Sequence, residues 1–197
     1  MNKLPITLLA TCLLFSSAAG AQAPAFIRGT ITAFEGNMLS VKSRDGAQLT
    51  LELAADTTVA AAKAIMLADL KPGAYVGCAA KRRPDGELVA LEVHTISPAV
   101  PAGFLPSWDL EPGATMTNAH LVAVLRTAGG NEITLEYPGG AQKILVPDGA
   151  PIVTTVPADR SALEPGEYVF VVPRKAPDGR ITALRIQVSR NGVRPPQ

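Results

Sequence analysis

A stretch of 22 residues occurs twice in this chain and limits what the chain can fold into. Residues 70–91 read LKPGAYVGCAAKRRPDGELVAL and residues 163–184 read LEPGEYVFVVPRKAPDGRITAL, with ten identical positions at an offset of 93. Shorter matches upstream continue the similarity at an offset of 94. These matches predict two copies of a unit of about 70 residues, near 25–97 and 117–191, which is close to the smallest size for an independent core.

The apolar residues inside each unit follow the period of β-strands. Leu49, Leu51 and Leu53 alternate with Thr50 and Glu52, so this segment has one buried and one exposed face. Turn residues, mainly Gly, Asn, Asp and Pro, separate the apolar runs. In the first unit these signals predict strands at 26–34, 38–43, 47–53, 74–81 and 87–95.

An alanine-rich segment from Ala60 to Leu70 predicts a short helical segment between the third and fourth strands. Three strands, a short helix and two strands is the element order of an OB-type barrel, although an SH3-like roll or an open meander gives a similar order. We therefore predict an all-β fold of two tandem five-stranded OB-like β-barrels, each with a short helical segment between its strands 3 and 4.

The first residues of the chain predict export. Lys3 precedes an apolar run from Leu4 to Phe15, and Ala19-Gly20-Ala21 forms a small-residue cleavage site. Together they are typical of a secretory signal peptide over residues 1–21. No later window is long and apolar enough for a membrane-spanning helix. We therefore expect a periplasmic protein with no membrane span.

Removal of the signal peptide also changes the counts of charges and cysteines. Of the 18 basic residues only Lys3 is lost, which leaves 17 against 17 acidic residues. A neutral chain argues against nucleic acid as a partner, because polyanion-binding domains are clearly basic. Cys12 is lost as well, so Cys78 cannot form an internal disulfide. Cys78 aligns with Val171 of the second unit, and we expect a buried, apolar side chain there.

The segment between the two units, residues 98–116, combines Pro and Gly with Phe104, Leu105 and the only tryptophan, Trp108. A flexible linker would be polar. We therefore expect an ordered strap, whose Trp108 packs against one or both barrels and fixes their relative orientation. A ligand-binding platform built around Trp108 is the alternative.

Several motifs of the chain resemble those of a known group of proteins. WDLEP at 108–112, TMTN at 115–118 and RNGVRPP at 190–196, together with the repeated LxPG and PDG turns, are similar to exported proteobacterial proteins of unknown function with tandem small β-barrel repeats. Some members carry the automatic label "metal ABC transporter permease", which this sequence contradicts, because a permease needs several membrane-spanning helices. Ser107 and Ala114 depart from the pattern of the group. The resemblance implies no catalytic residues.

The sequence lacks the usual motifs of enzymes. It contains no GxSxG, GxxxxGK[ST], HExxH, GxGxxG or CxxC. A Cys-His pair would have to join Cys78 to His94 or His120, and His94 aligns with Gln187, which predicts an ordinary surface histidine. We expect a non-catalytic, exported binding or interaction module without a cofactor, whose partner is an envelope protein or a small ligand. Its oligomeric state does not follow from these patterns.

Two alternative functions follow from other residues. Met116 and His120 lie on one face if residues 115–121 are extended, and because such ligands suit Cu(I), they predict a periplasmic, copper-type metal-handling protein that uses the central Trp108 segment. Basic residues lead into the hairpin between strands four and five of each unit: Lys81, Arg82, Arg83, Arg174 and Lys175. Because that loop commonly contributes to ligand sites of OB folds, these residues favour oligonucleotide or glycan binding by the OB-like barrels. Aromatic residues make up only 5% of the chain, which leaves few platforms for base stacking.

Overall fold

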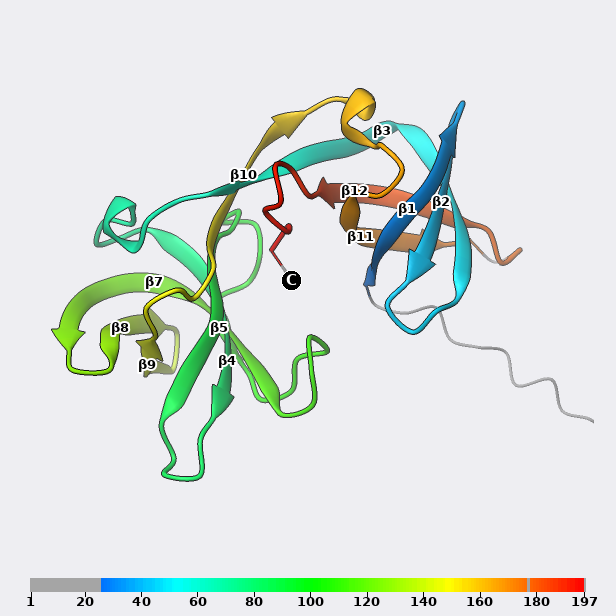
Figure 1. Cartoon of the computed structure of the whole chain (residues 1–197). Coiled ribbons are helices and arrows are strands. Elements are labelled where there is room, and N and C mark those ends of the chain that lie inside the picture. Colours follow the sequence, from blue (N-terminus) through cyan, green and yellow to red (C-terminus); the bar gives the residue numbers. More distant parts are fainter. Residues whose placement is uncertain (1–25, 177, 197) are drawn as a thin grey trace, which may run out of the picture.

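The computed structural model describes residues 26–176 and 178–196, which are built almost entirely from β-strands (Figure 1). The strands are β1 (Ile27–Glu35), β2 (Met38–Ser43), β3 (Gln48–Ala64), β4 (Tyr75–Arg82), β5 (Leu88–Thr95), β6 (Gly103–Leu105), β7 (Ala114–Thr127), β8 (Gly130–Tyr137), β9 (Gly140–Val146), β10 (Ile152–Ala158), β11 (Tyr168–Lys175) and β12 (Ile181–Val188). Two 3₁₀ turns, η1 (Leu67–Asp69) and η2 (Arg160–Ala162), precede β4 and β11. The all-β prediction is confirmed. The predicted signal peptide, residues 1–21, lies outside the described residues.

No helical segment among the described residues has the length and apolar character needed to cross a membrane.

The two ends of the described chain form one closed barrel, here named the outer barrel. Its strands follow one another around the barrel in the order β1-β2-β3-β12-β11, and β11 returns to β1. All neighbours are antiparallel except β12 and β3, which are parallel. Its core contains large aliphatic side chains from all five strands, including Ile31, Leu39, Leu51, Val171 and Ile186.

The middle of the chain forms a second closed barrel, here named the inserted barrel. Its order is β7-β8-β9-β5-β4, and β4 returns to β7. Again one pair, β5 with β9, is parallel. Its core includes Val76, Val93, Leu121, Ile133 and Ile144. In the outer barrel the last hairpin, β11–β12, crosses over to place β12 beside β3, whereas in the inserted barrel the first hairpin, β4–β5, has β5 beside the last strand, β9. Both barrels therefore have a Greek-key order, and an open meander is excluded.

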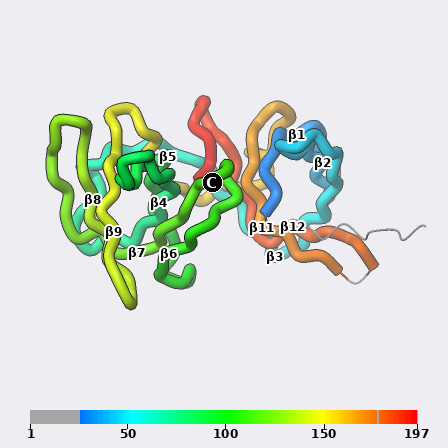
Figure 2. The backbone as a smooth tube through the Cα atoms, turned by 90° about the horizontal axis from the view of Figure 1, so that it is seen from below, coloured from blue at the N-terminus to red at the C-terminus, as the bar shows by residue number. Residues whose placement is uncertain are grey.

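The predicted units 25–97 and 117–191 are not the structural domains, because each barrel takes strands from both. The first unit gives β1–β3 to the outer barrel and β4 and β5 to the inserted barrel. The inserted barrel is formed by a continuous segment, residues 65–152, placed within the sequence of the outer barrel. Figure 2 shows the two barrels side by side, with the C-terminal segment (red) between them.

The predicted helical segment from Ala60 to Leu70 is wrong. Residues up to Ala64 continue β3. The rest of the segment contains one 3₁₀ turn, η1, and no α-helix. Val59 to Ala64 pair with β10, and Thr58 to Ala61 pair with β12, so both edges of the strand are hydrogen-bonded. Alanine's helix preference amounts to a few tenths of a kcal/mol per residue, and pairing on two sides outweighs it. β3 and β10 form the ribbon that joins the barrels (Figure 1).

Candidate binding cavity between the barrels

The strap, residues 98–116, packs on the outer barrel through an aromatic cluster, defined as Phe26, Trp108 and Phe170. The Phe26 ring centroid lies 5.4 Å from that of Trp108 and 5.1 Å from that of Phe170. The guanidinium of Arg28 lies over all three rings, at 5.0 to 5.7 Å from their centroids. Cation–π contacts of this kind are strongest when they are shielded from water, and the Arg28 side chain is only 3% exposed. The structure therefore agrees with an ordered strap that contacts a barrel through Trp108.

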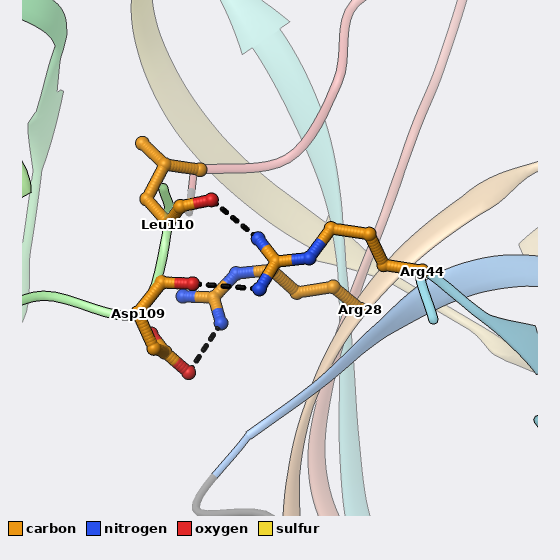
Figure 3. A network of polar contacts seen from close by, with 4 residues as sticks. All are labelled: Arg28, Arg44, Asp109 and Leu110. Carbon is orange, nitrogen blue, oxygen red and sulfur yellow. Dashed lines mark hydrogen bonds and ion pairs between the residues drawn. The ribbon is translucent and has the colours of Figure 1, made fainter. Parts of the chain in front are cut away.

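Two arginines of the outer barrel hold the strap next to Trp108 (Figure 3). Nη1 of Arg28 donates to Oδ2 of Asp109 at 2.8 Å. Arg44 donates hydrogen bonds to the backbone carbonyls of Asp109, at 2.7 Å, and of Leu110. Because the strap continues at both ends into strands of the inserted barrel, these bonds tie one barrel to the other.

A cavity of about 220 Å³ lies between the barrels beside the aromatic cluster. Its wall comes from the outer barrel, the ribbon, the inserted barrel, the strap and the C-terminal segment. The lining residues are Phe26, Thr58, Ala60, His94, Thr95, Ile96, Ser97, Val100, Trp108, Met116, Asn118, Thr155, Phe170, Arg185, Gln187 and Pro196.

The cavity lies where outer faces of strands from the two barrels meet. On β12, Ile186 and Val188 point into the core of the outer barrel, so Arg185 and Gln187 lie on its outer face. On β5, Val93 points into the other core, and His94 lies on the outer face. Side chains that would be solvent-exposed on a single barrel are therefore brought together here.

Three polar atoms of this wall are buried without a hydrogen-bond partner among the described residues: His94 Nδ1, Arg185 Nε and Gln187 Oε1. His94 Nδ1 lies 3.1 Å from Glu92 Oε1, close enough for an ion pair with a protonated imidazole, although the geometry is not that of a hydrogen bond. Buried polar atoms are usually satisfied. Partnerless atoms around a cavity indicate a surface that can bind polar groups of a ligand.

The prediction that His94 is a surface residue is wrong. The residue is 6% exposed, because the outer face of β5 here turns toward the cavity, which residues of the outer barrel, the ribbon and the strap enclose. Its ring packs on Gly77 of β4, where a Cβ atom would stand 2.8 Å from Cε1 of the ring. Glycine at this position lets the imidazole lie flat on the strand.

The structure does not bring Met116 and His120 together. They share one face of β7, as predicted for an extended segment, and it is the outer face, because Ala119 and Leu121 point into the core. Four residues of strand nevertheless place their Cα atoms about 13 Å apart. Met116 is buried and lines the cavity. His120 is exposed, its ring centroid is 4.9 Å from that of Tyr75, and its Nδ1 is 3.2 Å from the carbonyl oxygen of Gly73. Among the described residues, no group of three or more His, Cys, Asp or Glu side chains is arranged to hold a metal ion.

The basic residues singled out in the sequence lie on hairpins of different barrels. Lys81, Arg82 and Arg83 belong to the β4–β5 hairpin of the inserted barrel, whereas Arg174 and Lys175 end β11 of the outer barrel. None of them lines the cavity.

The first of these groups is engaged locally. Lys81 is 2.9 Å from Glu111, Arg82 donates to the carbonyl of Gly86, and Arg83 pairs with Asp85 and Glu87 at 3.1 and 3.0 Å. The contacts of Arg82 and Arg83 lie within the hairpin tip, whereas Lys81 pairs with a residue of the strap.

Cys78 is fully buried in the core of the inserted barrel, as predicted. Burial, and then the nearby carboxylate of Glu92, raise the pKa of the Cys78 thiol well above its ordinary value. The thiol is therefore protonated at neutral pH, and a nucleophilic thiolate does not form at this position.

Sequence reasoning identified Trp108 and Met116 but missed Phe26, Phe170 and Arg185. The available signal was an arginine in the middle of the apolar strand ITALRIQV. An arginine at such a position points to a binding site only when the outer face of the strand is covered, because on an uncovered strand it is solvent-exposed.

Residues 28–94 match a protein family described as a domain of unknown function, DUF5666. The matched segment covers β1 to β5 except the first residue of β1 and the last of β5, so three of its strands lie in the outer barrel and two in the inserted barrel. No curated protein and no solved structure matches the chain.

Proposed function

We propose that this protein is a non-catalytic, exported binding module of the periplasm, whose small-molecule ligand occupies the cavity between two OB-type barrels. The observation that carries the proposal is the wall of that cavity. It combines three aromatic rings with buried polar atoms of Arg185 and Gln187 that have no hydrogen-bond partner among the described residues. Binding sites for small molecules typically combine an apolar wall with a few placed polar groups.

The way in which the chain connects the barrels supports binding at their junction. The ribbon of β3 and β10 and the strap both cross between the barrels, so the two halves of the wall are held at a fixed distance. A preformed site loses little conformational entropy when its ligand binds. Two barrels linked by one flexible segment would not provide this.

The composition of the wall supports binding rather than catalysis. The sixteen lining residues that the structure describes include no Asp, Glu, Cys or Lys. A general acid or base, or an activated nucleophile, is usually one of these residues or a histidine with a positioned partner. His94, the only histidine among the described lining residues, pairs its Nδ1 with Glu92, and its Nε2 lies against Gly77 rather than against a nucleophile.

The proposal can be tested with a small-molecule extract of bacterial cells. The purified protein is incubated with the extract, and retained compounds are identified by ultrafiltration and mass spectrometry. Trp108 is the only tryptophan and lines the cavity, so its fluorescence should change when a retained compound binds. Ala60→Leu should fill part of the cavity and abolish both signals.

Ala55→Leu is the matched control, because Ala55 lies in the same strand, is exposed and does not line the cavity. This variant should retain the same compounds as the unmodified protein. Equal retention by the Ala60→Leu variant, or no retained compound at all, would contradict the proposal.

A further inference from the structure

The charge of the cavity wall limits what can bind there. Among the described lining residues, Arg185 is the only one with a fixed charge, and none is acidic. Among the described residues, no carboxylate lies within 4.0 Å of its guanidinium nitrogens, and its Nε is buried without a hydrogen-bond partner. A partly buried guanidinium without an anion is unfavourable, and its planar donors match a carboxylate.

The second arginine of this region is already neutralised. Arg28 pairs with Asp109 and lies against the aromatic cluster, and it does not line the cavity. Among the described residues Asp109 forms its ion pair with Arg28 and none with Arg185. The positive charge at the wall is left for a ligand.

The other lining residues indicate which groups the ligand carries besides its anion. Gln187 follows Arg185 on the same face of β12, and its Oε1 is a buried acceptor without a partner, which favours an N–H or O–H group near the anion. Phe26, Trp108 and Phe170 provide an apolar side. The volume of about 220 Å³ is below the ~300 Å³ at which pockets for drug-sized ligands begin.

Resting on the proposed function, we infer that the cavity binds a small organic carboxylate with an apolar or aromatic body. Its carboxylate pairs with the guanidinium of Arg185, and its body packs against the aromatic cluster. Charge-assisted bonds to a guanidinium are roughly twice as strong as neutral ones. The cavity therefore prefers small apolar molecules that carry a carboxylate to those of the same shape that do not.

The test uses phenylacetate as the probe and phenylacetamide as its neutral analogue of nearly equal shape. Titrations followed by Trp108 fluorescence and by calorimetry give both affinities. We expect phenylacetate to bind more tightly than the amide by about ten- to hundred-fold, as is typical for a hydrogen bond to a charged group. Arg185→Gln should lower the affinity for phenylacetate to that of the amide.

Two further variants make the result specific. Arg185→Lys keeps the charge but loses the planar donors, so it should restore part of the preference. Arg174→Gln removes a positive charge from the neighbouring strand, outside the cavity, and should change nothing. Unchanged urea midpoints would show that the Arg185 variants are folded.

Equal affinities for acid and amide, or an Arg185→Gln variant that binds phenylacetate normally, would overturn the inference and leave cavity binding intact. If neither probe binds, the chemical class of the compounds retained from the extract tests the inference. Retained carboxylates that are lost in the Arg185→Gln variant support the inference, and retained compounds without an anionic group overturn it. If nothing is retained, the proposed function itself fails.

Discussion

Arg28 joins the strap to the outer barrel through three rings and one carboxylate. The Asp109→Asn substitution removes the anion and leaves a buried guanidinium with aromatic partners only. We expect the free energy of unfolding to fall by about 1–2 kcal/mol, less than for a fully buried pair, because the Asp109 side chain is 48% exposed. Urea unfolding measures this loss, and the emission of Trp108 should shift to longer wavelength as the strap loosens.

Glu111→Gln provides the comparison for that substitution. It breaks the ion pair between Lys81 and Glu111, whose side chains are 50% and 43% exposed. Exposed pairs contribute about 0–1 kcal/mol, so a small effect is expected and the emission should not change. Equal losses in both variants would show that Arg28 and Asp109 do not hold the strap.

The thiol of Cys78 should be unreactive in the folded protein. In a Cys12→Ser variant, Cys78 is the only cysteine, and burial together with Glu92 raises the pKa of its thiol. Because alkylation needs the thiolate and access to the sulfur, iodoacetamide should not label the native protein at pH 8. Labelling should follow unfolding in urea, as measured by mass spectrometry. Rapid labelling of the native state would contradict the buried position.

The ring of His94 on β5 lies against Gly77 of β4, and this contact depends on the absence of a side chain at Gly77. A Cβ there would meet the ring of His94, so Gly77→Ala should destabilise the protein by about 1–3 kcal/mol. Because the clash is with a side chain, His94→Ala should remove most of that cost. A double-mutant cycle from urea unfolding should give a coupling energy of about 1 kcal/mol or more.

Gly29 of β1 is the matched position for this cycle. A Cβ there would meet the backbone carbonyl of Lys42 and lie 2.7 Å from Cγ1 of Val41. Because backbone cannot move aside, Gly29→Ala should cost more than Gly77→Ala and should show no coupling to His94→Ala. Coupling at both positions would indicate a general loosening of the fold.

At the scale of the whole molecule, the structure makes the stability of β4 and β5 depend on β7–β9 rather than on β1–β3. Ile133→Ala opens a cavity in the core of the inserted barrel and should cost about 2–5 kcal/mol. Hydrogen exchange should then increase in β4, β5 and β7–β9 and remain slow in β1, β2, β11 and β12. Mass spectrometry of peptic peptides resolves these segments.

Ile31→Ala, in the core of the outer barrel, should give the opposite pattern. Exchange should then increase in β1–β3, β11 and β12. If each predicted unit closed its own barrel, Ile133→Ala would instead expose β11 and β12. That outcome would refute the exchange of strands between the barrels.

Much of the local structure could be predicted from the sequence. The strands β1, β2, β4 and β5 lie within one or two residues of their predicted positions, because alternation and turn residues act over a few neighbours. The burial of Cys78 could be predicted for the same reason. Trp108 could be recognised as a packing residue, since a large aromatic in a Pro- and Gly-rich segment is otherwise out of place.

The tertiary structure alone decided how these elements combine. β3 continues through an alanine-rich segment because β10 and β12 pair with it, and this continuation sends β4 and β5 into the other barrel. His94 and Arg185 lie on outer strand faces, which the sequence marks as solvent-exposed. They become a cavity wall only because a second barrel covers them, and that contact depends on pairing between residues far apart in the chain.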